Sequence, residues 1–294
     1  MAGLGIAGRV RTGVALRDLT SYRIGGPAEI LVEPSCIGDV SLVLAEVRRS
    51  GAPLAVIGAG SNVLVPDEGL QGVVLRIGEP MGSVAEAGGV ITAQAGCADR
   101  DLAMCAARAG IEGFEFLEDI PGTVGGAIVQ NAEAWGSSVS DHLVEVEAVR
   151  PGGEIVALRG GDLSFGYRDS TFKQVGDLVV AAARFAPPGR GDPALICARM
   201  DDIRARRHSR YPLEHPSCGS VFKRPSGDYA GRLIEQAGLG GLRVGGACVS
   251  TRHHNFIVNT GGATAGDVKA LVEMVRDRVL ERFGVALERE LVYL

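Results

Sequence analysis

The 294-residue chain has few aromatic residues and no long hydrophobic run. Aromatic side chains make up 5% of it. Nowhere do eighteen apolar residues follow one another, so the sequence predicts no transmembrane helix. The first nine residues include no apolar core of signal-peptide length. We therefore expect a cytoplasmic protein without a membrane partner.

Regular cysteine and histidine spacings are also missing. The six cysteines form no Cys-x-x-Cys pair, which argues against a disulfide framework and fits a reducing compartment. The five histidines form no His-Glu-x-x-His motif, and the adjacent His253 and His254 would point to opposite faces of a strand. The sequence predicts no metal site.

The net charge of −5 argues against a dedicated nucleic-acid binder. Arginines do concentrate between positions 199 and 210, but a solvated helix face explains this cluster more simply. We expect no nucleic-acid partner. The oligomeric state stays open, with a monomer favoured.

Glycine, in contrast, is abundant: the chain has 43, where an average share of about 7% would give roughly 20. The first of two glycine-rich stretches, 56–65, is an apolar β-branched run that breaks at a turn of small residues. It predicts a strand, a tight turn with uncovered backbone amides, and a second strand. It lacks the Gly-Lys-Ser/Thr of a phosphate loop, and Val63 stands where a Rossmann fingerprint needs a third glycine. The turn residues are Gly58, Ala59, Gly60, Ser61 and Asn62.

The second stretch, 120–127, makes an ordinary turn a weaker explanation of the first. Its proline restricts one φ angle, its glycines allow close approach of the backbone, and Asn131 follows with an amide that can reach a carbonyl or a phosphate. Two such loops favour a dinucleotide, held in a two-part diphosphate cradle. The second set of candidate cofactor residues is Pro121, Gly122, Thr123, Gly125, Gly126 and Asn131.

Hydrophobic periodicity predicts an α+β chain of three modules. The first is a βαβ-type unit with a helix over 38–50, and the second begins near Ile91. The turn Pro151-Gly152-Gly153 predicts a hairpin, and the breaker cluster at 186–193 marks a boundary. Helices are expected over 100–109, 194–207 and 230–237, and strands over 28–32, 55–58, 73–75, 143–150, 154–158, 178–186, 247–250 and 255–259.

The last thirty residues predict a helix and then a strand. Thr264 and Asp267 resemble a capping box, an apolar stripe follows, and Gly284 supplies the C-terminal stop. We expect a strand over 285–294, in which Glu288 and Glu290 share one face.

Three separate segments each contain one strong polar candidate. Arg168 lies in an aromatic setting where a guanidinium can clamp a carboxylate, Ser220 follows a glycine that leaves its hydroxyl accessible, and Glu290 lies on the expected last strand. Taken singly, each can be explained as an ion pair, a turn hydroxyl or an exposed acid. The two glycine loops make this combination more specific.

An ordered series of motifs then resembles the UDP-N-acetylenolpyruvoylglucosamine reductase family over nearly the whole chain. The series comprises 22–28, 58–65, 120–127, 167–170, 219–223, 230–235, 255–259 and the terminal acid. The resemblance implies a PCMH-type two-part FAD-binding domain and an α+β substrate-binding domain. Its expected boundaries are an N-terminal segment at 1–22, the FAD domain at 23–188 with subdomains at about 23–80 and 81–188, and the substrate domain at 194–294.

The resemblance also implies a reaction. FAD is bound non-covalently, its diphosphate on the two loops, and NADPH is the hydride donor. The reduced flavin converts UDP-N-acetylglucosamine enolpyruvate to UDP-N-acetylmuramate, a step in peptidoglycan precursor synthesis. Arg168 would stabilise the growing carboxylate charge, Ser220 would protonate the enolate carbon, and Glu290 would polarise the carboxylate, with Glu288 as the fallback. Tyr167, Lys223 and Arg224 would bind the substrate.

Several positions depart from the family pattern. Arg224 replaces a usual asparagine, Glu133 interrupts a run of small residues, and Glu118-Asp119 stands where small residues are common. The short interval from Arg168 to Ser220 resembles the subgroup without a tyrosine lid over the sugar.

Three alternatives therefore stay open. The first is a paralogue that reduces a different enolpyruvyl nucleotide or nucleoside in secondary metabolism. The second is an oxidase or dehydrogenase on the same cradle, although many of those bind flavin through an early histidine and none precedes His142. The third is a non-catalytic nucleotide-binding module.

Overall fold

The computed structural model describes residues 4–186 and 189–294, and the chain divides into two compact units. Unit 1 comprises the described residues up to Thr12 together with Ile30–Ala59 and Gly72–Arg206, and unit 2 comprises Gly13–Glu29, Gly60–Gln71 and Arg207–Leu294. Three of the five cuts fall inside β1 (Arg9–Ala15), β2 (Pro27–Glu33) and β5 (Leu70–Arg76), one follows Ala59 and one lies inside α5 (Pro193–Arg210), so neither unit is contiguous in sequence. The linear domain boundaries stay a prediction, and their limits at 1 and 188 lie outside the described residues.

The first sheet has the strand order β1-β2-β5-β3, with β3 (Leu54–Ile57) parallel to β5. Helix α1 (Ile37–Ser50) connects β2 to β3 and buries Val40, Val43 and Leu44, whose spacing places them on one helical face. It ends at Gly51, whose φ of 69° is the left-handed conformation typical of a helix C-cap. The expected βαβ-type unit is confirmed.

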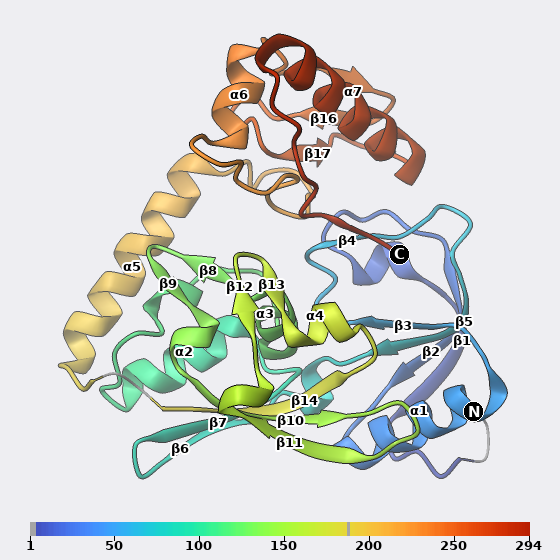
Figure 1. Cartoon of the computed structure of the whole chain (residues 1–294), viewed down its shortest axis with the longest axis vertical. Coiled ribbons are helices and arrows are strands. Elements are labelled where there is room, and N and C mark those ends of the chain that lie inside the picture. The colour runs from blue at the N-terminus through green and yellow to red at the C-terminus, as the bar shows by residue number, and fades with distance from the viewer. Residues whose placement is uncertain (1–3, 187–188) are drawn as a thin grey trace. The chain divides into compact units, whose positions relative to one another are not determined.

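The second sheet lies within unit 1 and has the order β11-β10-β14-β7-β6, with every neighbouring pair antiparallel. Its strands are β6 (Val84–Ala87), β7 (Val90–Gln94), β10 (Leu143–Val149), β11 (Ile155–Arg159) and β14 (Val179–Phe185). Val149 pairs with Ile155 across the predicted Pro151–Gly153 turn, which confirms the hairpin. Helix α3 (Val124–Gln130) packs on β14 and β7 (Figure 1).

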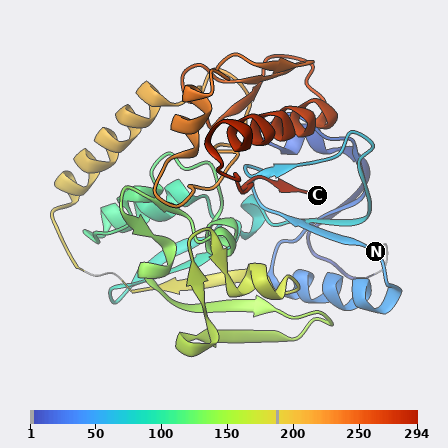
Figure 2. The same ribbon diagram turned by 45° about the horizontal axis from the view of Figure 1, so that its top comes forward.

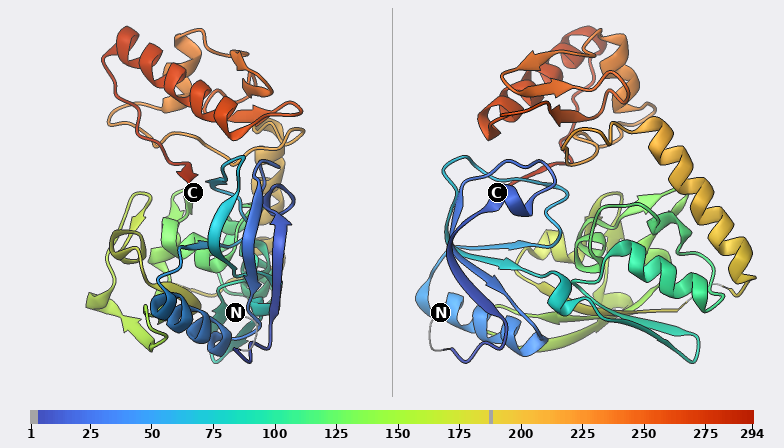
Figure 3. Two further views of the ribbon diagram at one scale, coloured as in Figure 1. Left: turned by 90° about the vertical axis from the view of Figure 1, so that its right-hand side faces the viewer. Right: turned by 180° about the vertical axis from the view of Figure 1, so that it is seen from behind.

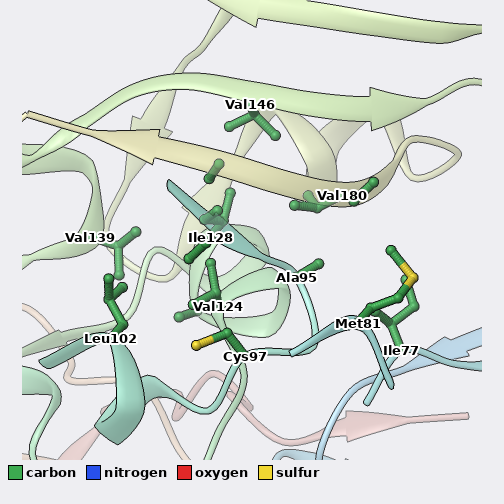
Figure 4. Packing of buried hydrophobic residues seen from close by; sticks show 14 of the residues in the cluster. Ile77, Met81, Ala95, Cys97, Leu102, Val124, Ile128, Val139, Val146 and Val180 are labelled. Carbon is green, nitrogen blue, oxygen red and sulfur yellow. The ribbon is translucent and has the colours of Figure 1, made fainter. Parts of the chain in front are cut away.

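The core of unit 1 joins this sheet to its helices. Val124 and Ile128 of α3, Leu102 of α2 (Asp99–Arg108) and Val146 of β10 belong to one buried cluster (Figure 4). These side chains are at most 1% exposed, and burying each stabilises the unit by about 1.5–3 kcal/mol.

Further elements in this part of the sequence are α4 (Thr171–Val175), α5 (Pro193–Arg210) and the two-residue strands β8 (Glu133–Ala134), β9 (Ser137–Ser138), β12 (Phe165–Gly166) and β13 (Asp169–Ser170). The long helix α5 is drawn in gold in Figure 3.

Unit 2 is built around the three-stranded sheet β15-β16-β17. Helix α7 packs against β15 and β16, and it is the long dark-red helix of Figure 2. Both halves of its capping box form, since Thr264 accepts from the Asp267 amide and Asp267 accepts from the Thr264 amide; Gly284 ends the helix as predicted. The bounds are α6 (Ala230–Gln236), β15 (Arg243–Val244), β16 (Ala247–Val249), β17 (Ile257–Asn259) and α7 (Ala265–Phe283).

The predicted strand over 285–294 is wrong in extent. Only Val292–Tyr293 forms a strand, β18, which pairs in parallel with β4 (Val63–Leu64). Leu287 and Leu291 are buried, but Arg289 between them on the same expected face is exposed, so the segment does not present one alternating face. Helices of the described ranges include none long and apolar enough to cross a membrane.

Candidate active site

The two predicted glycine loops lie side by side in unit 1. A Cβ atom added to Gly58, directly after β3, would lie 2.4 Å from Oγ1 of Thr123 in the second loop. A side chain at position 58 would therefore fill the space between the loops. The absence of a side chain at position 58 thus lets the two loops pack against each other.

The first loop then continues into unit 2. Gly60 has a φ of 67°, and its carbonyl accepts a hydrogen bond from the Ser21 amide. Asn62 lies beside the C-terminal segment, because its Nδ2 donates to the Glu290 carbonyl at 3.4 Å and its carbonyl accepts from the Val292 amide. Ala59 before Gly60 and Ser61 after it are half-buried.

The second loop is attached to the sheet of unit 1 and exposed along one side. The amides of Val124 and Gly125 donate to the carbonyls of Cys97 and Ala95. A Cβ on Gly125 would lie 2.9 Å from Ala95 Cβ, so packing against the sheet explains this glycine. Pro121 and Gly126 are exposed, and an added Cβ on Gly126 would meet nothing closer than 3.8 Å. Bare backbone is thus available on the outer side of this loop.

Two buried carboxyl groups flank this loop, and the sequence did not identify either as part of the site. Glu118 is fully buried, and its Oε1 accepts hydrogen bonds from Arg100 at 3.1 Å and Arg204 at 2.8 Å. Asp99 is 1% exposed, and Oδ1 has no hydrogen-bond partner within the described residues. Burial raises the pKa of Asp99 to about 8. In the sequence Asp99 looks like an ordinary first-turn acid of α2, so no local signal distinguishes it.

Arg168 lies at the tip of a tight hairpin in unit 1. Gly166 pairs with Asp169, which leaves Tyr167 and Arg168 as the two turn residues, and Arg168 takes a φ of 54°. Its guanidinium donates to the Glu133 carbonyl at 3.4 Å and lies 5.3 Å from the ring centroid of Tyr167, which is 45% exposed. The hairpin presents both side chains at the surface of the unit.

Side chains from neighbouring helices hold that hairpin in place. Asn131 Nδ2 donates to the Gly166 carbonyl at 3.0 Å, and its Oδ1 accepts from the Ser140 amide. Lys173 Nζ donates to the Arg168 carbonyl at 3.0 Å, and the buried Ser170 hydroxyl donates to the Val129 carbonyl. The Asn131 amide thus positions the Arg168 turn, and its expected cofactor contact stays a prediction.

Ser220 and Glu290 come together through their backbones in unit 2. Ser220 forms an antiparallel bridge with Phe256, and Val221 accepts a hydrogen bond from the Glu290 amide at 2.8 Å. Asn255 holds the same segment: Oδ1 accepts from the Phe222 amide at 3.0 Å, and Nδ2 donates to its carbonyl at 2.9 Å. Sequence reasoning did not find this role, because the contact joins residues 33 positions apart.

The side chains at and near Ser220 differ in their exposure to solvent and in their interaction partners. The Ser220 hydroxyl is half-buried and has no hydrogen-bond partner in the described part of the chain. Glu290 is half-buried, whereas Glu288 is exposed and forms an ion pair with Lys223. Arg224 is exposed, and its guanidinium lies 4.1 Å from the ring centroid of Tyr229. Of the two acids, Glu290 is therefore the one sheltered from water.

Comparisons with known proteins agree with this arrangement. The UDP-N-acetylenolpyruvoylglucosamine reductase C-terminal domain matches residues 211–294, and an FAD-binding domain matches 28–159. A reductase of this name from Levilactobacillus brevis is 43% identical over 275 residues, which cover 94% of this chain and 90% of the relative. The chain belongs to the UDP-N-acetylenolpyruvoylglucosamine reductase family.

Further relatives extend over nearly the whole length. The Geobacillus kaustophilus reductase is 42% identical and covers 94% of this chain and 90% of its own. The crystal structure of the Thermus caldophilus reductase superposes with a TM-score of 0.83 at 35% identity, covering 97% of this chain and 99% of that one. The expected α+β architecture, with an FAD-binding domain followed by the family's C-terminal domain, is confirmed, as is a flavin-dependent oxidoreductase.

Proposed function

We propose that this chain reduces UDP-N-acetylglucosamine enolpyruvate to UDP-N-acetylmuramate with NADPH and FAD, in peptidoglycan precursor synthesis. The observation that carries this is family membership along nearly the whole chain. The chemistry that bound FAD supplies is hydride transfer, taken from NADPH and delivered to the vinyl carbon of the enolpyruvyl ether. No specific observation favours a different enolpyruvyl substrate.

The two glycine loops would hold the diphosphate. A side chain on Gly58 or Gly122 would meet Thr123 or Asp99, so these glycines allow close packing of the loops, and Gly126 is open to the outside. Backbone N–H groups can then donate to phosphate oxygens without rearrangement. These loops supply binding and orientation, and the reaction uses other residues.

Arg168 would stabilise the substrate carboxylate. Addition of hydride to the vinyl carbon puts negative charge on the adjacent carbon and its carboxylate, and a guanidinium matches a carboxylate through two parallel hydrogen bonds. Because hydrogen bonds already restrain the hairpin, its backbone loses little conformational entropy when Arg168 binds the substrate.

Ser220 would complete the reduction by giving its proton to the enolate carbon, and the serine oxygen would regain a proton from solvent. A hydroxyl without an internal partner can donate without first breaking a protein hydrogen bond. A half-buried Glu290 would polarise the carboxylate from the same region of unit 2.

The cofactor assignment can be tested at Gly126. Gly126→Val adds a side chain where the structure has space, so the protein should fold, yet the branched group should block the diphosphate. Gly161→Val is the matched control, because an added Cβ there meets nothing within 4 Å and the residue lies outside both loops. We expect Gly126→Val to purify without flavin and the control to stay yellow. Stoichiometric flavin in Gly126→Val would remove the loop from the site.

The reaction is tested by product identity. Without oxygen, purified holoprotein should oxidise more than one equivalent of NADPH per flavin only when the enolpyruvyl nucleotide-sugar is present, and mass spectrometry should find the product heavier by two hydrogens. NADPH oxidation without that product would contradict the proposal.

A further inference from the structure

Asp99 lies against the backbone of the second glycine loop. Its amide donates to the Gly122 carbonyl at 3.2 Å, and the preceding Ala98 bridges to Thr123. A Cβ added to Gly122 would lie 2.3 Å from Asp99 Oδ2, so the carboxyl group is directed at the backbone of Gly122. With 1% exposure and an unpartnered Oδ1 among the described residues, it is a buried acid that the reaction above does not use.

Within residues 4–186 and 189–294, charged and titratable neighbours do not pair with this carboxyl group. On its own helix Arg100 is bonded to Glu118, and Asp101 and Cys105 are not bonded to Asp99. From the packed elements, Glu86 of β6 pairs with Arg190, and Glu115 pairs with Arg199. Cys97, just before the helix, has its pKa raised to about 12 by burial, so its thiol is neutral. Burial alone raises the pKa of Asp99 to about 8, which leaves the acid protonated at neutral pH.

A protonated acid is the form compatible with an anion on this loop. A diphosphate bound to the Gly122 backbone would carry negative charge within a few ångströms of Asp99, where a carboxylate would be repelled in a weakly screened interior. A neutral carboxyl group is not repelled, and it has a donor to offer to the loop.

We propose that Asp99 is a positioning residue for FAD: its neutral carboxyl group supports the Gly122 backbone, and diphosphate binding requires it to hold its proton. This rests on the proposed location of the diphosphate on the second loop. The affinity for FAD should therefore depend on pH through the titration of Asp99.

The sign follows from proton linkage. Below the pKa of about 8, apoprotein already has Asp99 protonated, so the FAD dissociation constant should not depend on this group. Above this pKa, the Asp99 carboxylate must take up a proton when FAD binds, so the FAD dissociation constant should rise by up to tenfold per pH unit. Between pH 7 and about pH 9.5 we expect roughly a thirtyfold weakening.

The test titrates apoprotein with FAD, following flavin fluorescence, across this pH range. Asp99→Asn keeps the size and stays neutral, so its dissociation constant should change by less than about threefold over the range. Asp101→Asn is the matched control, since it makes the same change at an exposed position of α2 and should keep the wild-type profile. Equal profiles for Asp99→Asn and wild type, or a flat wild-type profile, would overturn the inference.

Calorimetry of the wild type decides the matter even if Asp99→Asn does not fold. At about pH 8.5, in buffers that differ in ionisation enthalpy, binding of FAD should take up about three-quarters of a proton per site. No proton uptake would overturn the inference while leaving the proposed function intact. Wild-type protein that binds no FAD at any pH would contradict the proposed function itself, and this inference with it.

Discussion

The hairpin of Arg168 in unit 1 and the Ser220 segment in unit 2 hold their functional side chains in opposite ways. Side chains of Asn131 and Lys173 fix the carbonyls on either side of the hairpin tip, and the Arg168 guanidinium is itself directed to a carbonyl. The Ser220 segment is also fixed, through its backbone and Asn255, yet the serine hydroxyl has no partner within the described ranges.

The difference fits the two proposed tasks. A guanidinium that stabilises developing charge is most effective when its orientation is set in advance, because no reorganisation is then needed as the charge appears. A proton donor must release its proton, and an internal acceptor for the hydroxyl would compete with the substrate carbon. The first three variants below each act on one side of this contrast, and the fourth tests a substrate contact outside it.

Ser220→Ala should have the largest effect. The loss of a general acid lowers rates by about 10²–10⁴, and we expect reoxidation of reduced flavin by substrate to slow by about 10³. Flavin reduction by NADPH should be nearly unchanged, because the serine acts only on the enolate. Stopped-flow measurement of both half-reactions tests this, with exposed Ser226→Ala as the control. Equal slowing of both half-reactions would make Ser220 structural.

Arg168→Lys should follow, with kcat/KM lower by about 10² despite the retained charge. A point-like ammonium cannot reproduce a two-bond clamp on a carboxylate. Steady-state kinetics with Arg184→Lys as a surface control measures the effect. A loss below about tenfold, or roughly 1.4 kcal/mol, would show that Arg168 does not hold the developing charge.

Asn131→Gly sharpens the comparison, because it frees the hairpin without touching Arg168 itself. Asn131 has a φ of 43°, which glycine tolerates, so the change removes the amide with little backbone strain. We expect kcat to fall about tenfold through the looser turn, with FAD affinity unchanged. A weaker FAD affinity at constant kcat would instead place Asn131 on the cofactor.

Arg224→Asn should have the smallest effect. The side chain is exposed, and its guanidinium lies 4.1 Å from the ring centroid of Tyr229. Loss of a charge-assisted contact to substrate should raise KM by about threefold with little change in kcat. An unchanged KM for the nucleotide-sugar would show that Arg224 does not contact it.

The sequence predicted the regular elements well where a local signal exists. The α7 capping box, the Gly284 stop and the Pro151–Gly153 hairpin each depend on residues close together in the chain. The failed strand over 285–294 contains alternating residues, but its burial depends on what packs against it from distant segments.

Long-range contacts explain why the site was only partly predictable. Three contacts of the site join segments separated by more than twenty residues. They are the hydrogen bonds of Asn255 with Phe222 and of Asn131 with Gly166, and the contact of buried Asp99 with Gly122. Side-chain identity suggests what such groups can bond, and only the fold decides their partners. The same holds for the units, because most of their cuts fall within single strands or helices.

Anaerobic reoxidation of the reduced holoprotein tests the central claim most directly. Bound flavin is reduced with one equivalent of NADPH and mixed with UDP-N-acetylglucosamine enolpyruvate, while UDP-N-acetylglucosamine serves as the control without the enolpyruvyl group. We predict that the visible absorbance of oxidised flavin returns fully with the first compound, with one product molecule per flavin, and does not return with the second. Flavin that stays reduced with both compounds, yet is reoxidised by oxygen, would contradict the account.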